Sequence, residues 1–102
     1  MITAFVLRNP RFSILNVRNL YSVRKAMKTY AAWHPNCAYC GRKQHIDVHH
    51  IIPVKNAPHL AGDYNNFISL CRKPACHLIV GHRGNWKDSN PNVREICKLM
   101  NK

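Results

Sequence analysis

The sequence predicts a small α+β domain in which two short strands lie between two helices. Apolar residues recur at intervals of three and four over residues 17–32, which is the periodicity of an amphipathic helix. Short apolar runs at residues 46–52 and 67–70 favour strands. Asn90 and Pro91 fit the N-cap and the first position of a closing helix. With 102 residues, the chain is expected to form one domain with a modest core.

The first predicted helix has an apolar side and a basic side. The apolar side carries Leu20, Val23, Met27 and Tyr30. At about 100° per residue, the opposite side carries Arg18, Lys25 and Lys28. Two interpretations of the basic side stay open: solvated lysines on a helix that packs on the core, or contacts with phosphate groups.

Turn-forming residues divide the rest of the chain. Pro53 is expected to end the first strand, and residues 55–66 are typical of a loop. A short helix is expected to begin at Cys76 and to break near Gly81. The closing helix has one apolar stripe, made of Val93, Ile96, Cys97 and Met100. Cys97 is therefore expected to be a core residue, because free cysteines are commonly buried as small hydrophobes.

The charge balance favours a polyanionic partner. Sixteen Lys and Arg oppose four Asp and Glu, which gives a formal net charge of +12. This balance indicates nucleic acid before membrane. The alternative is a solvated charged surface without a partner.

Four cysteines have the spacing of metal ligands. They form two pairs, Cys37 with Cys40 and Cys71 with Cys76, separated by thirty residues. Zinc binds four thiolates in a tetrahedron, and paired thiolates on two tight turns supply that arrangement. Gly41 would let the first turn fold back over the ion. We predict one structural Zn²⁺, while a redox role, unmetallated core cysteines and His77 as a substitute ligand stay open.

Histidines supply a second set of candidate groups, together with one asparagine. These residues are His49, His50, Asn66, His77 and His82. Hydrolysis of a phosphodiester requires a base that activates water and a cation that neutralises developing charge. A neutral imidazole can be the base or a metal ligand near pH 7, so adjacent histidines could divide the two tasks. Four scattered carboxylates cannot easily form a multi-carboxylate two-metal site, and nuclease chemistry here would therefore rest on histidine. The alternative for the pair is a core histidine beside an exposed one.

Over residues 24–86 the sequence resembles the HNH endonuclease family. In that family a His or Asp and then a His close the first strand, an asparagine begins the second, and a histidine opens the helix. The same order is followed here by His49, His50, Asn66, Cys76 and His77. The resemblance implies a ββα-metal (His-Me finger) core over residues 33–87 with flanking N- and C-terminal helices. It also implies a single nuclease domain over residues 1–102.

The resemblance implies a role for each of these residues. His50 would be the general base, and Asn66 would hold the loop that orients it. His49 and His77 would bind the catalytic cation. Water activated by His50 would attack phosphorus in line and leave a 5′-phosphate and a 3′-hydroxyl. His82 follows His77 by five residues, about 140° round an ideal helix, so it is either a third ligand or a contact to phosphate.

The histidine pair carries a geometric condition. Side chains of neighbouring strand residues point to opposite faces. His49 and His50 can therefore face one phosphate only if the strand ends or bulges there. Pro53 and the loop after it favour such an end.

The cation and the DNA contacts are the remaining site predictions. Histidine at position 49, where the family often has aspartate, makes the site suit Mn²⁺, Ni²⁺, Co²⁺ or Zn²⁺, with Mg²⁺ as the physiologically available candidate. Arg83 and Lys87 are candidate phosphate contacts after the short helix. Trp86 is expected to be a core anchor in preference to a base-stacking residue.

The resemblance implies DNA as the partner, and a role in genome packaging or homing for a bacteriophage or mobile element. Cutting both strands would need a homodimer or two encounters, and a phage packaging protein is a further candidate partner. Residues 1–7 are too short for a membrane span and lack a signal-peptide pattern, so we expect no membrane association and a cytoplasmic location, in the host cell for a phage protein. The alternatives are a non-catalytic zinc-stapled DNA-binding module and a zinc-dependent protein-interaction domain, of which the second would show no salt-dependent DNA affinity.

Overall fold

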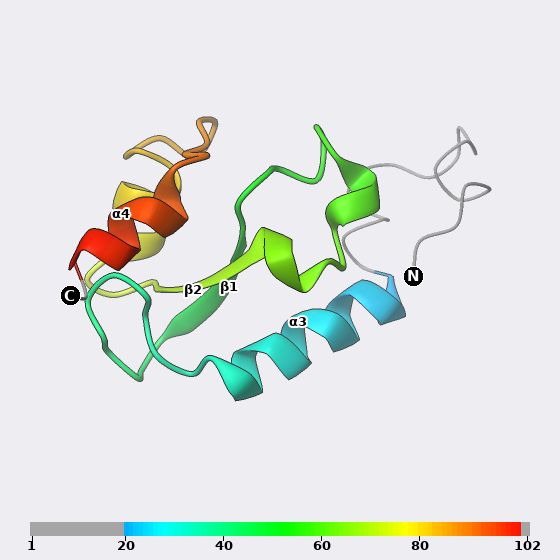
Figure 1. Ribbon diagram of the computed structural model, residues 1–102, viewed down its shortest axis with the longest axis horizontal. Coiled ribbons are helices and arrows are strands. Elements are labelled where there is room, and N and C mark those ends of the chain that lie inside the picture. Colours follow the sequence, from blue (N-terminus) through cyan, green and yellow to red (C-terminus); the bar gives the residue numbers. More distant parts are fainter. Residues whose placement is uncertain (1–19, 101–102) are drawn as a thin grey trace.

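The computed structural model describes residues 20–100 and has the predicted α+β architecture (Figure 1). The helices are α3, Tyr21–Trp33, and α4, Val93–Met100. The strands are β1, Ile46–His50, and β2, Phe67–Cys71. Within residues 20–100 there are also two 3₁₀ turns, Pro58–Leu60 and Tyr64–Asn66, and one π-helical turn, His77–Gly81. Within the described residues, no helix is long and apolar enough to cross a membrane.

The two strands form an antiparallel hairpin. Its register pairs His50 with Phe67. The first strand is two residues shorter than predicted. Beyond His50 the chain bonds to Asn66 instead of to β2, through the backbone at Ile51 (2.9 Å) and through the Asn66 side chain at Ile52 (2.8 Å).

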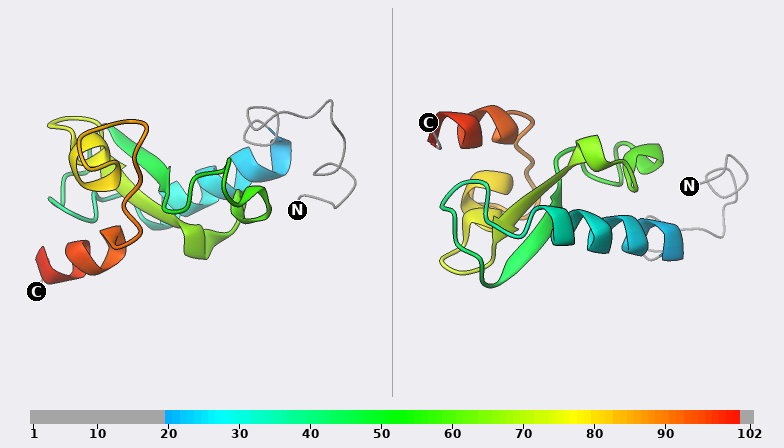
Figure 2. Two further views of the ribbon diagram at one scale, coloured as in Figure 1. Left: turned by 90° about the horizontal axis from the view of Figure 1, so that it is seen from above. Right: turned by 60° about the horizontal axis from the view of Figure 1, so that its bottom comes forward.

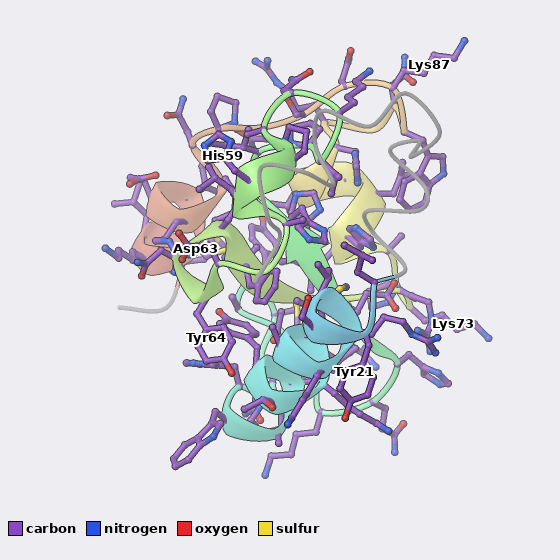
Figure 3. The ribbon with its side chains drawn as sticks, turned by 90° about the vertical axis from the view of Figure 1, so that its right-hand side faces the viewer. Tyr21, His59, Asp63, Tyr64, Lys73 and Lys87 are labelled. Atoms are coloured by element: carbon purple, nitrogen blue, oxygen red, sulfur yellow. The ribbon has the colours of Figure 1, made fainter. Side chains whose placement is uncertain are left out.

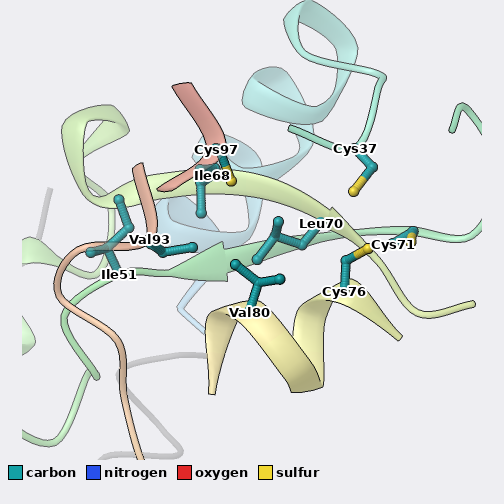
Figure 4. Packing of buried hydrophobic residues seen from close by; sticks show 9 residues of the cluster. All are labelled: Cys37, Ile51, Ile68, Leu70, Cys71, Cys76, Val80, Val93 and Cys97. Atoms are coloured by element: carbon teal, nitrogen blue, oxygen red, sulfur yellow. The ribbon is translucent and has the colours of Figure 1, made fainter. Parts of the chain in front are cut away.

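The hairpin packs on a different element at each face, since successive side chains of a strand point in opposite directions. Phe67 faces α3, where its ring meets that of Tyr30 edge to face with centroids 5.4 Å apart. Ile68 and Leu70 face the other way and belong to a buried cluster with Val80, Val93 and Cys97 (Figure 4). The hairpin therefore lies between α3 on one side and the π-helical turn with α4 on the other (Figure 2).

The sidedness predicted for the first helix is confirmed over the part that the structure describes. Val23 and Tyr30 are buried, and Leu20 and Met27 pack against a small cluster around Val23. The basic residues Lys25 and Lys28 are exposed. Arg18, the third residue predicted on the basic side, lies outside the described residues.

The apolar stripe predicted for α4 is only partly buried. Val93 and Cys97 are 0% and 4% exposed, which confirms Cys97 as a core residue. Ile96 and Met100, the other two members of the stripe, are 36% and 56% exposed. The helix is turned so that Arg94 reaches the hairpin, where it donates to the Phe67 carbonyl at 2.8 Å. Asn90 accepts from the Asn92 N–H at 3.1 Å, as expected of a residue that caps the start of a helix.

Candidate metal centres and cleft

The four paired cysteines come together from three places in the fold. The ligand atoms of Cys37, Cys40, Cys71 and Cys76 all lie within 4.8 Å of one another. The sulfurs of Cys40 and Cys71 are 3.6 Å apart. Thiolates about 2.3 Å from one tetrahedral zinc ion stand roughly 3.8 Å from each other, so this set fits the ion. The cluster could therefore hold the predicted structural Zn²⁺.

A tight turn after α3 presents the first cysteine pair. The Cys37 N–H donates to the Arg42 carbonyl at 2.7 Å, and the Gly41 N–H donates back to the Cys37 carbonyl at 2.9 Å. Gly41 has a φ of 81°, a conformation that glycine adopts without steric cost. The predicted turn at Gly41 is confirmed.

Local hydrogen bonds set the order in which the thiols ionise. Burial raises the pKa of the Cys71 thiol, but backbone N–H groups of Cys76 and Ala75 outweigh it and lower the pKa to about 7. Burial and the neighbouring thiols raise the pKa of Cys76. Cys97 lies in the core outside the cluster, and burial raises its pKa to about 11. Cys71 therefore ionises more readily near neutral pH than Cys76 or Cys97 does.

Three histidines form a second cluster. His49 comes from β1, His77 begins the π-helical turn and His82 directly follows it. The ligand nitrogens of these three residues lie within 4.8 Å of one another. Nδ1 of His49 and Nε2 of His77 are 3.1 Å apart. Nitrogen ligands about 2.1 Å from a shared ion stand roughly 3 Å apart at right angles, so this spacing suits a divalent cation.

The π-helical turn brings His77 and His82 to the same side. On an α-helix a five-residue gap would turn the second ring away, but a π-helix closes i to i+5 hydrogen bonds, so residues five apart lie above one another. The two ring centroids are 5.0 Å apart. His82 therefore joins the cluster through a widened helical turn, which ends at Gly81 as expected from the sequence.

Hydrogen bonds orient the two rings beside the turn. Nδ1 of His77 donates to the Asp47 carboxylate at 3.1 Å, and Nδ1 of His82 donates to the Asp88 carbonyl at 2.8 Å, because both oxygens can only accept. Nε2 is then the lone-pair nitrogen in each neutral ring. Nε2 of His49 is buried with no hydrogen-bond partner among residues 20–100. Nδ1 of His49 is the nitrogen that faces Nε2 of His77, at 3.1 Å, and could share a cation with it, so this donor set fits a bound cation.

Burial keeps these imidazoles neutral. Burial, followed by the charges of His77, His82 and His50, lowers the pKa of His49 to about 3. Burial also lowers the pKa of His77, although the Asp47 carboxylate opposes it. Neutral imidazole is the form that binds metal. Both rings are therefore ready to act as ligands at pH 7.

His50 occupies the opposite face of the hairpin, next to α3. Its Nε2 lies 2.8 Å from the Ala61 carbonyl, and its ring meets Phe67 edge to face at 5.2 Å. The side chain of Asn66 connects the surrounding loops through two hydrogen bonds to the Ile52 backbone. Oδ1 accepts from the Ile52 N–H at 2.8 Å, and Nδ2 donates to the Ile52 carbonyl at 3.1 Å. The backbone after His50 is thus held at both the N–H group and the carbonyl of Ile52.

One cleft of about 610 Å³ is lined by all four of these histidines: His49, His50, His77 and His82. β1 ends at His50, and the chain then turns away, so the two neighbouring side chains reach the cleft from opposite faces. His49 and His50 were expected to share a site only if the strand ended or bulged there, and the strand does end at His50. Lys55 and Lys87 also line the cleft.

The prediction of Trp86 as a core anchor is wrong. Its side chain is 60% exposed, and its ring lies 5.2 Å from that of His77 and 4.9 Å from that of His82, measured between centroids. Trp86 instead forms part of the cleft wall. The indole lies against the imidazoles of His77 and His82, which line the cleft. Because of this position at the cleft, the indole is not part of the core.

The predicted basic contacts lie in two places. Lys87 lines the histidine cleft and points away from the chain in Figure 3. Lys25 and Lys28 line a separate groove between α3 and β1. Arg83 is exposed and lines neither of these two hollows.

Two residues of the site were missed by sequence reasoning. Asp47 orients His77, and its position two residues before His49 on a strand is a signal that could have found it, because such residues share a face. Lys55 lines the cleft, but no pattern in the loop distinguishes it from other lysines.

The fold and both clusters define a class of protein: a small α+β domain that pairs a four-cysteine metal site with a histidine-based one. Residues 37–83 match the family model described as HNH endonuclease. The matched segment includes the four paired cysteines, which suit a zinc-binding variant of such a domain. Searches of curated proteins and of solved structures returned no match. This match suggests a nuclease or DNA-binding role and the use of a divalent metal.

Proposed function

We propose that the protein is a metal-dependent HNH endonuclease that hydrolyses phosphodiester bonds in DNA. The convergence of four histidines on one cleft carries the proposal, because it places a candidate base beside three candidate ligands. The net charge of +12 supports a polyanionic substrate.

His50 is the general base of the proposed reaction. Because the Ala61 carbonyl can only accept, Nε2 of His50 carries the proton, and Nδ1 is the basic nitrogen of the neutral ring. Nδ1 takes a proton from water as the water oxygen bonds to phosphorus. The bond from phosphorus to the 3′-oxygen breaks, and that oxygen takes a proton from solvent, which leaves a 5′-phosphate and a 3′-hydroxyl.

Asn66 is the positioning residue for this base. Its two bonds to Ile52 fix the chain just after His50, and a third contact of 3.4 Å reaches the Leu60 carbonyl. Leu60 precedes Ala61, the hydrogen-bond partner of His50. Asn66 therefore holds both the base and the carbonyl that orients it.

His49, His77 and His82 are the proposed ligands of the catalytic cation. When bound, the cation would supply positive charge that stabilises the phosphate and the leaving oxygen in the transition state. Three imidazole nitrogen ligands favour Mn²⁺, Ni²⁺ or Zn²⁺, with Mg²⁺ the physiologically available alternative. The four cysteines hold a separate structural Zn²⁺.

Lysines around the histidines are the proposed contacts to DNA. Lys87, with the additional Lys55, lines the cleft, and Lys25 and Lys28 line the groove beside α3. Arg83 is exposed just after the turn. Phosphate contacts of this kind fix the duplex on the protein without reading its sequence.

Plasmid cleavage tests the proposal. Zinc-loaded protein is incubated with supercoiled plasmid and Mg²⁺, Mn²⁺ or Ni²⁺, with EDTA as a control. The proposal expects open-circle or linear DNA that disappears with EDTA and with His50→Ala. His59→Ala removes an exposed histidine that lies outside the cleft and should leave cleavage intact. Salt-sensitive DNA binding without cleavage under any cation would instead favour the non-catalytic binding module.

A further inference from the structure

We propose that Asp47 and Arg72 form a positioning pair that links the cysteine cluster to the histidine cluster and raises the affinity of the histidines for a divalent cation. The inference rests on the proposed function, because it assigns a cation to the histidine cluster. It concerns two residues that are not themselves in either ligand set.

Both oxygens of the Asp47 carboxylate are engaged. Oδ2 accepts from Nδ1 of His77 at 3.1 Å, and Oδ1 forms an ion pair with the Arg72 guanidinium. The side chains of Asp47 and His77 are 26% and 17% exposed, so this bond is largely shielded from water. Asp47 shares a strand face with His49, and the carboxylate therefore meets His77 from the same side as the His49 ring.

The contact fixes which nitrogen of His77 is available as a ligand. The carboxylate holds the proton on Nδ1 of His77. The lone pair of His77 Nε2 is then directed toward Nδ1 of His49, and these two nitrogens are 3.1 Å apart. Without the carboxylate, the other tautomer and a flipped ring would compete with this arrangement. Carboxylates that orient metal-binding histidines in this way also make the imidazole a better donor.

Arg72 ties this arrangement to the cysteine cluster. It directly follows Cys71, and its backbone N–H donates to the His45 carbonyl at 2.7 Å, which anchors the start of the loop. The loop ends at Cys76, which directly precedes His77. Arg72 and His77, the two partners of Asp47, are therefore each adjacent in sequence to a cysteine of the proposed zinc site. The cysteine cluster would hold both of them in position beside Asp47.

Mn²⁺ binding to the zinc-loaded protein, followed by electron paramagnetic resonance without DNA, tests the pair. We expect Asp47→Ala to raise the Kd for Mn²⁺ about 10- to 100-fold, the usual effect of removing a group that orients a metal ligand. Glu95→Gln removes the same charge from exposed α4 and should leave the Kd unchanged. His77→Ala should abolish binding and gives the reference for loss of a ligand.

A double-mutant cycle separates positioning from general charge. Arg72→Gln should raise the Kd by less than Asp47→Ala does, and it should have no further effect in the Asp47→Ala background, since Arg72 acts through Asp47. Lys73→Gln, the adjacent exposed cation in the same loop, is the matched control and should change nothing. If Asp47→Ala loses zinc, Asp47→Asn keeps the shape and an acceptor oxygen and should give a smaller rise.

Cleavage kinetics give a second readout. The Mn²⁺ concentration for half-maximal rate should rise in Asp47→Ala, while kcat at saturating Mn²⁺ stays close to wild type. Equal Kd values for wild type and both Asp47 variants would overturn the inference and leave the proposed function standing. Absence of Mn²⁺ and Ni²⁺ binding by the wild type would overturn both.

Discussion

His49 and His50 are neighbours in β1 whose side chains leave opposite faces of the hairpin and line one cleft. His49 is 3% exposed and lies against the π-helical turn, whereas His50 is half-buried beside Phe67. Two adjacent imidazoles thus have different surroundings, one suited to binding a cation and one to accepting a proton. The end of the strand at His50, next to the hydrogen bonds that Asn66 makes to Ile52, would make the proposed division of roles possible.

Gly81 should be required for the position of His49. A Cβ at this residue would lie 3.0 Å from Cδ1 of Leu70 and 3.2 Å from Nε2 of His49. We expect Gly81→Ala to lower the free energy of unfolding by about 1–3 kcal/mol through overpacking and to weaken Mn²⁺ binding. Denaturant and Mn²⁺ titrations measure both effects. Gly62→Ala, whose Cβ would meet nothing nearer than 3.9 Å, is the control, and the same losses in both variants would contradict the explanation.

Asn66→Ala should reduce both stability and turnover. The substitution removes two part-buried hydrogen bonds between the Asn66 side chain and the Ile52 backbone, and each contributes about 0.5–1.5 kcal/mol net. Because the base loses its support, kcat should fall more than Mn²⁺ affinity does. Thermal unfolding and plasmid nicking are compared with Asn65→Ala, the exposed neighbour. Unchanged turnover in Asn66→Ala would show that the loop does not position His50.

Stability should fall as the solution becomes acidic. Burial lowers the pKa of His49 to about 3, whereas an unfolded histidine titrates near 6.5. Between about pH 6.5 and 3 the unfolded state binds a proton at this residue that the folded state does not. The free energy of unfolding should then drop by up to about 1.4 kcal/mol per pH unit on account of this residue. His49→Gln should flatten this part of the curve, and an unchanged slope would contradict the assignment.

Zinc content should distinguish the four clustered cysteines from Cys97, which lies outside the cluster. Cys76→Ser removes a member of the cluster, and we expect it to lose zinc and to unfold at lower temperature, because a bound ion would join the turn after α3 to the end of β2. Cys97→Ser lies in the core and should keep one zinc per chain. Elemental analysis and thermal unfolding distinguish the two variants. Equal zinc content in both would argue against the four-cysteine site.

The sequence predicted the parts of the site that depend on residue type and order. Ligand chemistry restricts a four-cysteine pattern to few uses. The order of His49, Asn66 and His77 indicated one residue on the first strand, one where the second strand begins and one at the helical turn, and Asn66 directly precedes β2. The widened turn was not predictable, because a π-helix depends on backbone hydrogen bonds that leave no periodic signal over five residues. The exposure of Trp86 was missed for a related reason, since hydrophobicity alone favours burial and cannot show which rings line a cleft.

The division of labour between the histidines is tested most directly by measuring Mn²⁺ affinity and DNA cleavage on the same preparations of wild type, His50→Ala and His77→Ala. The account predicts that His50→Ala binds Mn²⁺ as wild type does but does not cleave, while His77→Ala loses both binding and cleavage. Cleavage by His50→Ala at the wild-type rate, or loss of Mn²⁺ binding in that variant while its zinc is retained, would contradict the account.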